Sequence, residues 1–291
     1  MTSLKSDERT VEEHISDLLK ANGLTGGKFL EICAVPKLKK HCFNLMQNAG
    51  VDMFSVDENN QTALFKAAES GNLVLLRSLL EEGLDPEHTD TFGENALMVA
   101  LRCGNGSIAE FLLKIARDPV NTMDKEGATL LHKAAWGNLP EMAKLLFEEY
   151  GVDLEAKDHY GHTAMHVAAY QGNIRFLKYL LAKSANINAV DNEGKTPIFC
   201  GAYDINLKTV KLLCENGANL LWKENSGLTV LEYAVHKKLF KTAKFLNGKS
   251  GIFYPDLDMM IRKHNAERDW IVKELVKKIK QTSSKDDQPM P

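Results

Sequence analysis

Histidine and aspartate are the side chains of this sequence that could carry acid–base or metal chemistry, and both recur at fixed intervals. His132 and His166 lie 34 residues apart, each three positions after a threonine. The aspartates open a repeated six-residue phrase. The sequence contains no H-E-x-x-H motif, no complete phosphate-binding loop, no G-x-S-x-G elbow and no zinc-ligand spacing. We therefore predict no catalytic residue, no metal and no cofactor, and we assign the aspartates to turns, where their carboxylates accept backbone N–H groups.

The phrase Asp-x-x-Gly-x-Thr, with substitutions, runs through the middle of the chain. It begins at Asp57, Asp90, Asp124, Asp158, Asp191 and, with glutamate in the first place, Glu224. Successive first residues are 33 or 34 positions apart. A period of this length is typical of stacked repeats, in which each unit contacts only its neighbours. The functional question therefore becomes which surface binds which partner.

One repeat, residues 158–190, predicts its own local structure. Gly161 permits a left-handed turn residue, and Thr163 stands where a helix N-cap belongs. A short helix should follow over residues 164–169. Gly172 and Asn173 should end it with a turn, and a longer helix is expected over residues 174–183, with an apolar stripe at helical spacing.

These features resemble the ankyrin-repeat family. Its phrase T-P-L-H-x-A-A is matched by Thr129-Leu-Leu-His132-Lys-Ala-Ala and by Thr163-Ala-Met-His166-Val-Ala-Ala, while Thr196-Pro-Ile-Phe keeps the proline. The resemblance is strong over residues 57–248 and weaker back to residue 28. It implies an all-α ankyrin-repeat solenoid of helix–turn–helix units with hairpin loops. It also implies that the repeated histidines are hydrogen-bonding struts between turns.

We predict five segments from these patterns. Residues 1–27 form an N-terminal helical cap, 28–56 a degenerate first ankyrin repeat, 57–248 six ankyrin repeats, 249–280 a C-terminal helix and 281–291 a disordered tail. Both terminal helices carry apolar faces that can cover the ends of the stack. The helix beginning at Pro255 has an alternative role as a docking element, because Ile261, Arg268 and Leu275 follow a heptad spacing.

Three repeats depart from the pattern at turn positions. Asn60 replaces the turn glycine in the first clear repeat, and asparagine tolerates the left-handed region better than most residues. Ile205 and Lys238 stand where other repeats have the glycine between helices. We expect those two turns to be strained or rebuilt.

Register indicates a candidate binding surface. In this family, the residue after each first-helix Ala-Ala pair faces the concave groove, and here that position holds Glu69, Arg102, Trp136, Tyr170, Tyr203 and His236. Three successive aromatic residues suit a partner-binding site, because Trp and Tyr dominate interface hot spots. The hairpin residues Phe92, His159, Tyr160 and His162 would extend it. The alternative is that the rings pack on each other or on the hairpins.

The resulting expectation is a non-enzymatic adaptor that binds one or more proteins and is monomeric in isolation. A net charge of -3 and a pI near 6.3 argue against nucleic acid and anionic membranes. Five cysteines without a pairing pattern suggest a reducing compartment, the cytoplasm, with the nucleus as an additional location. The alternative is a regulatory or substrate-recruiting subunit of an enzyme complex, such as a ubiquitin ligase.

Asn188 is a candidate modification site. It ends the segment Leu181-Ala-Lys-Ser-Ala-Asn-Ile-Asn188, which resembles the family segment that intracellular asparaginyl hydroxylases accept. The alternative is an ordinary turn-forming asparagine.

Overall fold

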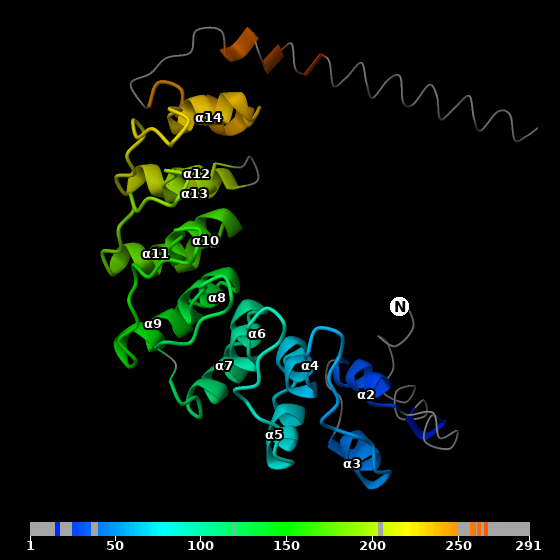
Figure 1. Cartoon of the computed structure of the whole chain (residues 1–291). Coiled ribbons are helices and arrows are strands. Elements are labelled where there is room, and N and C mark those ends of the chain that lie inside the picture. Colours follow the sequence, from blue (N-terminus) through cyan, green and yellow to red (C-terminus); the bar gives the residue numbers. More distant parts are fainter. Residues whose placement is uncertain are drawn as a thin grey trace, which may run out of the picture.

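The computed structural model describes residues 15–17, 25–35, 40–118, 120–202, 206–249, 257–259, 261–262 and 265–266, with the side chain of His41 left aside. Over these residues the chain is a curved stack of helix pairs (Figure 1). The only β features of this described part are two isolated bridges, Met123 with Thr129 and Lys223 with Thr229. The prediction of an all-α solenoid is therefore confirmed.

Seven helix pairs follow one another along the stack. We number the repeats from the one that begins at Asp57, and one pair precedes it. The first helices are α2 (Gly26–Cys33), α4 (Ala63–Ser70), α6 (Ala96–Arg102), α8 (Leu130–Trp136), α10 (Ala164–Gln171), α12 (Pro197–Cys200) and α14 (Val230–His236). The second helices are α3 (Lys40–Asn48), α5 (Leu73–Glu81), α7 (Gly106–Leu113), α9 (Pro140–Glu148), α11 (Ile174–Ala182), α13 (Leu207–Glu215) and α15 (Phe240–Leu246). In Figure 1, α4, α6, α8 and α10 lie on the inner side of the curve, with α5, α7, α9 and α11 outside.

The repeated aspartates organise the hairpins between helix pairs. In each of the first five repeats, one carboxylate oxygen accepts the backbone N–H groups two and four residues later; for Asp158 the donors are Tyr160 and His162. The hairpins are also joined to one another. Backbone bonds such as His159 N–H to the Glu126 carbonyl, at 2.8 Å, recur between successive tips. The aspartates therefore act as turn acceptors, as the sequence predicted.

Left-handed backbone conformations occur where the turn chemistry requires them. Gly161 has φ 80°, and Asn60, in the equivalent place, has φ 61°. Lys238 has φ 58°, which confirms a strained turn in the sixth repeat, because a side chain costs about 1–2 kcal/mol there. Ile205 lies outside the described residues. In the third repeat Asn138 takes this conformation, with φ 56°, whereas the preceding Gly137 has φ -77° and ψ 0°.

The apolar stripes of the helices form one continuous core. Phe176, Leu177 and Leu180 of α11 are fully buried, as the helical spacing predicted. Residues from both ends of the described chain join this core: Ile15 and Leu257 are buried in it, and Ile261 packs against it. The other predicted cap positions, including Val11, Leu18, Leu19 and most of the segment from Pro255 to Lys280, lie outside the described residues.

A second set of polar contacts joins neighbouring helix pairs. The position just before each second helix holds Asn72, Asn105, Leu139, Asn173, Asn206 and Leu239. Three of these asparagines donate from Nδ2 to a backbone carbonyl at the end of the preceding repeat's first helix: Asn105 to Ala68 at 2.7 Å, Asn173 to Ala135 at 2.7 Å, and Asn206 to Tyr170 at 2.8 Å. We call these contacts asparagine ties. Leucine cannot make one, so the boundaries before Leu139 and Leu239 depend on other contacts.

Candidate functional site

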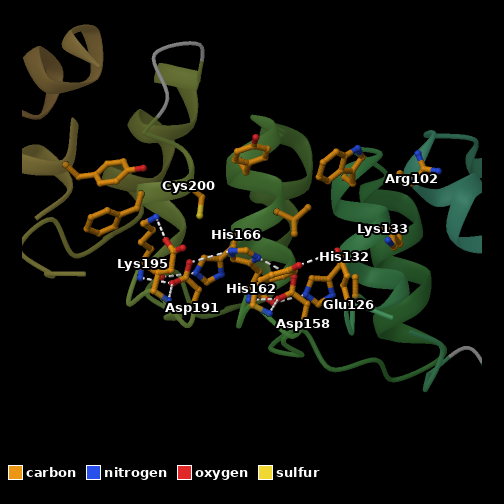
Figure 2. Close-up of a pocket in the computed structure, with 18 residues that line it drawn as sticks. Arg102, Glu126, His132, Lys133, Asp158, His162, His166, Asp191, Lys195 and Cys200 are labelled. Carbon is orange, nitrogen blue, oxygen red and sulfur yellow. Dashed lines mark hydrogen bonds and ion pairs between the residues drawn. The ribbon is translucent and has the colours of Figure 1, made fainter. Parts of the chain in front are cut away.

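A hollow of about 520 Å³ lies on the inner side of the stack and extends across the middle repeats (Figure 2). We call it the central groove. Its walls are first-helix residues and its floor is hairpin residues from the third to the fifth repeats. It is lined by Arg102, Glu126, Ala128, His132, Lys133, Trp136, Asp158, Tyr160, His162, His166, Val167, Tyr170, Asp191, Glu193, Lys195, Phe199, Cys200 and Tyr233.

Two of the predicted aromatic residues lie in the groove with half of their surface open to solvent. Trp136 ends α8 and is 48% exposed, and Tyr170 occupies the same register position in α10 and is 51% exposed. Each ring stands at the end of its helix, directly after the buried Ala-Ala pair, and is therefore left open to solvent. Neither ring is buried in the core.

The other predicted site residues divide into three groups. Arg102, Tyr160 and His162 also line the central groove. Phe92 and His236 are exposed but do not line it. Tyr203 lies outside the described residues. Glu69 and His159 are exposed and do not line the groove either, so the structure brings five of the ten residues named from register and hairpin position to one hollow.

Four charged side chains form a network at the end of the groove nearest α6. Lys133 Nζ lies 2.6 Å from Glu94 Oε1 and 2.5 Å from Asp124 Oδ2, and Arg102 Nη2 lies 3.2 Å from Glu94 Oε2. Burial opposes the charged form of Lys133, but hydrogen bonds to Asp124 and Glu94 outweigh it and raise the lysine pKa. Two cations and two carboxylates therefore neutralise each other here.

The floor of the groove holds an imidazole between two carboxylates. His162 Nδ1 lies 3.3 Å from Asp158 Oδ2, and its Nε2 lies 3.5 Å from Asp191 Oδ2 (Figure 2). Both carboxylates are nearly inaccessible to solvent, whereas the imidazole is about one third exposed. The carboxylates belong to successive repeats, so His162 spans the boundary between the fourth and the fifth.

The repeated histidines lie behind this floor and serve as struts. His166 Nδ1 accepts the backbone N–H of Thr163 at 3.1 Å, and its Nε2 lies 3.1 Å from the carbonyl of Lys195 in the next repeat. His132 repeats the arrangement with Thr129 and the carbonyl of His162. These partners require a neutral ring protonated on Nε2. Burial lowers the pKa of both histidines, that of His166 to about 4.

The residue three positions after each N-cap threonine determines whether the threonine hydroxyl is satisfied. Histidine contacts Thr163 Oγ1 at 3.0 Å, and Glu232 accepts from Thr229 Oγ1 at 2.8 Å. Phenylalanine takes this position after Thr62 and Thr196. Those two buried hydroxyls have no hydrogen-bond partner among the described residues. The repeats with phenylalanine therefore lack both the strut and the cap contact.

Two further charged groups of the groove were missed by the reasoning from sequence. Glu126 is exposed at a hairpin tip, with the Tyr160 hydroxyl 3.3 Å from its Oε1. Lys195 pairs with Glu193, and its Nζ lies 5.4 Å from the centroid of the Tyr233 ring. The position of two acidic residues in the repeat could have identified them. Glu126 and Glu193 stand two residues after the aspartate that begins their repeat, which is the position of the predicted site residues Phe92 and Tyr160.

Burial favours the protonated form of the thiols of Cys33, Cys200 and Cys214. Burial raises the pKa of Cys33 and of Cys200, which lines the groove, to about 12, and that of Cys214 to about 11. Such thiols stay protonated and unreactive near neutral pH. Within the residues the structure describes, no group of three histidine, cysteine or acidic side chains is arranged to hold a metal ion. Within the same residues, no helix has the length and apolar character needed to cross a membrane.

Asn188, the candidate modification site, lies in a partly buried turn that follows α11 in the chain. Its backbone N–H donates to Asn186 Oδ1 at 3.0 Å, and its own Oδ1 accepts the backbone N–H of Asn219 at 2.8 Å. The side chain therefore links two repeats, which is consistent with the turn-forming role.

Comparison with known proteins agrees with this architecture. Relatives include an ankyrin repeat protein of Rickettsia felis, 37% identical over 131 residues, which are 44% of this chain and 43% of the relative. SH3 and multiple ankyrin repeat domains protein 2 of Homo sapiens is 30% identical over 142 residues, 48% of this chain and 8% of the relative. An L-asparaginase of Dirofilaria immitis is 30% identical over 137 residues, 47% of this chain and 23% of the relative. The matches thus cover less than half of each of these relatives.

The family model for ankyrin repeats in sets of three copies matches residues 30–122, 115–191 and 165–258. These matches cover most of the chain and include all six repeats defined by the aspartate phrase. With the helix pairs, the hairpin hydrogen bonds and the histidine struts, they lead to one conclusion: the chain belongs to the ankyrin-repeat family.

Proposed function

We propose that this chain is a non-catalytic adaptor whose central groove receives a segment of a partner protein. Ankyrin repeats in general mediate protein–protein interactions. The observation that carries the proposal is the pair of half-exposed rings, Trp136 and Tyr170, at the same position of successive repeats beside a preformed hollow. Such rings supply large contact area at low cost in side-chain entropy.

The exposed ring surface is enough to anchor a partner. Each ring has about 200 Å² of side-chain surface, and half of it is open. Burying about 100 Å² of apolar surface contributes about 2.5 kcal/mol at ~25 cal/mol per Å². This matches the loss of 2 kcal/mol or more that is typical when a hot-spot residue is truncated.

Tyr170→Ala tests the proposal, with melting temperature and partner affinity measured on the same protein. The variant keeps the backbone carbonyl that receives the Asn206 tie. We expect a small change in melting temperature and a loss of affinity of at least tenfold. The matched control is Phe54→Ala, an aromatic side chain of similar exposure outside the groove. A large fall in melting temperature with affinity retained would mean that the ring is a packing group and would contradict the proposal.

The partner for this assay is recovered by affinity capture with the intact chain and identified by mass spectrometry. We propose further that the protein is monomeric and works in the cytoplasm, with the nucleus as an additional location, without nucleic-acid or membrane partners. The net charge of -3 supports the part of this proposal that excludes nucleic acid and anionic membranes as partners. Light scattering of the purified chain and fractionation of native cells are the corresponding measurements.

We also propose that residues 1–27 and 249–280 cap the stack. The burial of Ile15 and Leu257 in the common core supports capping over a separate docking role for the C-terminal segment. Capture with the full chain and with a chain ending at residue 254 tests this. We expect the truncated chain to be less stable but to capture the same partners. If the truncated chain folds but no longer captures a partner, the C-terminal segment is a docking element.

A further inference from the structure

We infer that the partner segment is basic and that an arginine or lysine side chain enters the central groove beside Trp136 and Tyr170. The inference rests on the proposed function, because it names the chemistry of the occupant of the same groove. It follows from three observations: which charges of the groove are already neutralised, which are not, and what the exposed rings can bind.

The cations that line the groove are occupied by the chain itself. Arg102 and Lys133 are held by Glu94 and Asp124 in the network described above. Lys195, at the other end, pairs with Glu193. An acidic partner would have to break these pairs, and two of the three carboxylates in them, those of Glu94 and Asp124, are almost fully buried. The cations are therefore poorly placed to receive an anion.

The other three carboxylates of the groove, those of Glu126, Asp158 and Asp191, form no ion pair with a lysine or arginine among the described residues, and only Asp191 interacts with Lys195 at longer range. Glu126 is exposed at the groove edge, and among the described residues its polar contact is the neutral hydroxyl of Tyr160. Asp158 and Asp191 face one shared imidazole, that of His162. Even a protonated His162 would leave an excess of negative charge over this part of the floor. Charge complementarity thus favours a positively charged side chain.

The rings add a second attraction for the same kind of group. Cations are drawn to the faces of Trp and Tyr rings, most strongly when the site is partly desolvated. The groove already contains such a contact, because Lys195 Nζ lies 5.4 Å from the centroid of the Tyr233 ring. Trp136 and Tyr170 offer open ring surface, and Glu126 offers an open carboxylate at the same hollow. A guanidinium or ammonium group can satisfy both, whereas an apolar side chain would leave the exposed Glu126 carboxylate without a cation.

Peptide selection on the intact chain tests the inference without assuming a sequence. Random peptides displayed on phage, long enough to cross three repeats, are selected against the wild-type protein and sorted by loss of binding to Trp136→Ala. We expect the groove-dependent peptides to share an arginine or lysine. Replacing it with glutamine should weaken binding about tenfold, and binding should weaken as salt rises, because exposed charges are screened.

The matched variants are Glu126→Gln and Glu58→Gln. Each removes one exposed carboxylate, but Glu58 lies at a hairpin that does not line the groove. Glu126→Gln should weaken the selected peptides about tenfold with an unchanged melting temperature, and Glu58→Gln should leave their affinity within about twofold. Equal effects of the two variants would overturn the basic-partner inference.

The remaining outcomes separate this inference from the proposed function. Groove-dependent peptides that are acidic, or apolar without a basic residue, would overturn the inference and leave the groove as a binding site. A selection in which no peptide depends on Trp136 or Tyr170 would overturn both. If light scattering shows that the chain alone forms dimers that Trp136→Ala dissociates, a second copy is the occupant and the basic partner is likewise overturned.

Discussion

Protonation of His166 provides the sharpest test of how the repeats are held together. In an unfolded chain this imidazole takes up a proton near pH 6.5, whereas burial in the fold lowers its pKa to about 4. Between these pH values the unfolded chain binds more protons than the folded one. Stability from the neutral strut is therefore fully present above about pH 6.5 and is lost as the pH falls towards 4.

The size of the effect follows from the same two pKa values. Each pH unit between them is worth about 1.4 kcal/mol, so the full contribution is about 3 kcal/mol, of which most is lost by about pH 4.5. The side chain is 1% exposed, so solvent screens it little. His132, whose pKa is lowered in the same direction, adds to the acid sensitivity of the whole protein.

The assay compares the free energy of unfolding in urea for the wild-type protein and for His166→Gln, from about pH 7.5 to about pH 4.5. Subtracting the two curves removes the titration of His132 and of the carboxylates, which both proteins share. Near neutral pH the variant should be less stable by about 1 kcal/mol, because glutamine can accept the Thr163 N–H as Glu232 accepts that of Thr229, but the bond to the Lys195 carbonyl is lost. The difference should shrink, and then reverse, as the pH falls.

Leu180→Ala is the control for this experiment. It should cost about 2–5 kcal/mol, because the leucine is fully buried in α11, and that cost should not depend on pH, because no titrating group is removed. If the curves for His166→Gln and the wild-type protein stay parallel over the same range, as those for Leu180→Ala should, the imidazole is not a buried neutral strut.

Three further predictions concern single side chains. Thr196→Val should leave stability unchanged or raise it by up to about 1 kcal/mol, because the buried hydroxyl has no partner among the described residues. Thr163→Val should instead cost about 1 kcal/mol, because the contact with His166 is lost. Midpoints of urea unfolding compare the two variants. Lys238→Gly should raise stability by about 1 kcal/mol, measured in the same way, because it relieves a left-handed lysine; a lower midpoint would contradict this. The hypothesis that Asn188 is hydroxylated predicts a peptide one oxygen heavier in protein from native cells, and mass spectrometry that finds only the unmodified peptide would end it.

The repeat architecture could be predicted because its determinants are local. Gly161 and Thr163 specify a turn and a helix start within a few residues, and the same arrangement recurs six times, so errors at one repeat are corrected by the others. Register then placed Trp136 and Tyr170 beside the groove. The sixth-repeat strain at Lys238 was predicted for the same reason, since a left-handed position is defined by the local chain.

The electrostatics of the groove could not be obtained in the same way. Lys133 is one residue after a histidine strut and reads as an ordinary exposed helix position. It is part of the site because Glu94 of the preceding repeat and Asp124 of its own hairpin both lie within ion-pair distance. Whether Glu126 is free for a partner likewise depends on which cations the neighbouring repeats have already neutralised. Such pairings depend on the three-dimensional arrangement of two repeats at once.

The asparagine ties have a mechanical consequence. A pull along the stack, such as a bound partner or a neighbouring domain would exert, loads every boundary between repeats. The third, fourth and fifth repeats are tied to one another by Asn173 and Asn206, whereas Leu139 and Leu239 leave the boundaries on either side of this block without a tie. Under tension the boundary before Leu239 should yield first, because the buried ion pair between Lys133 and Glu94 still joins the repeats at the boundary before Leu139. The repeats that hold most of the central groove would then stay together, and a bound partner would remain in place while the sixth repeat separates.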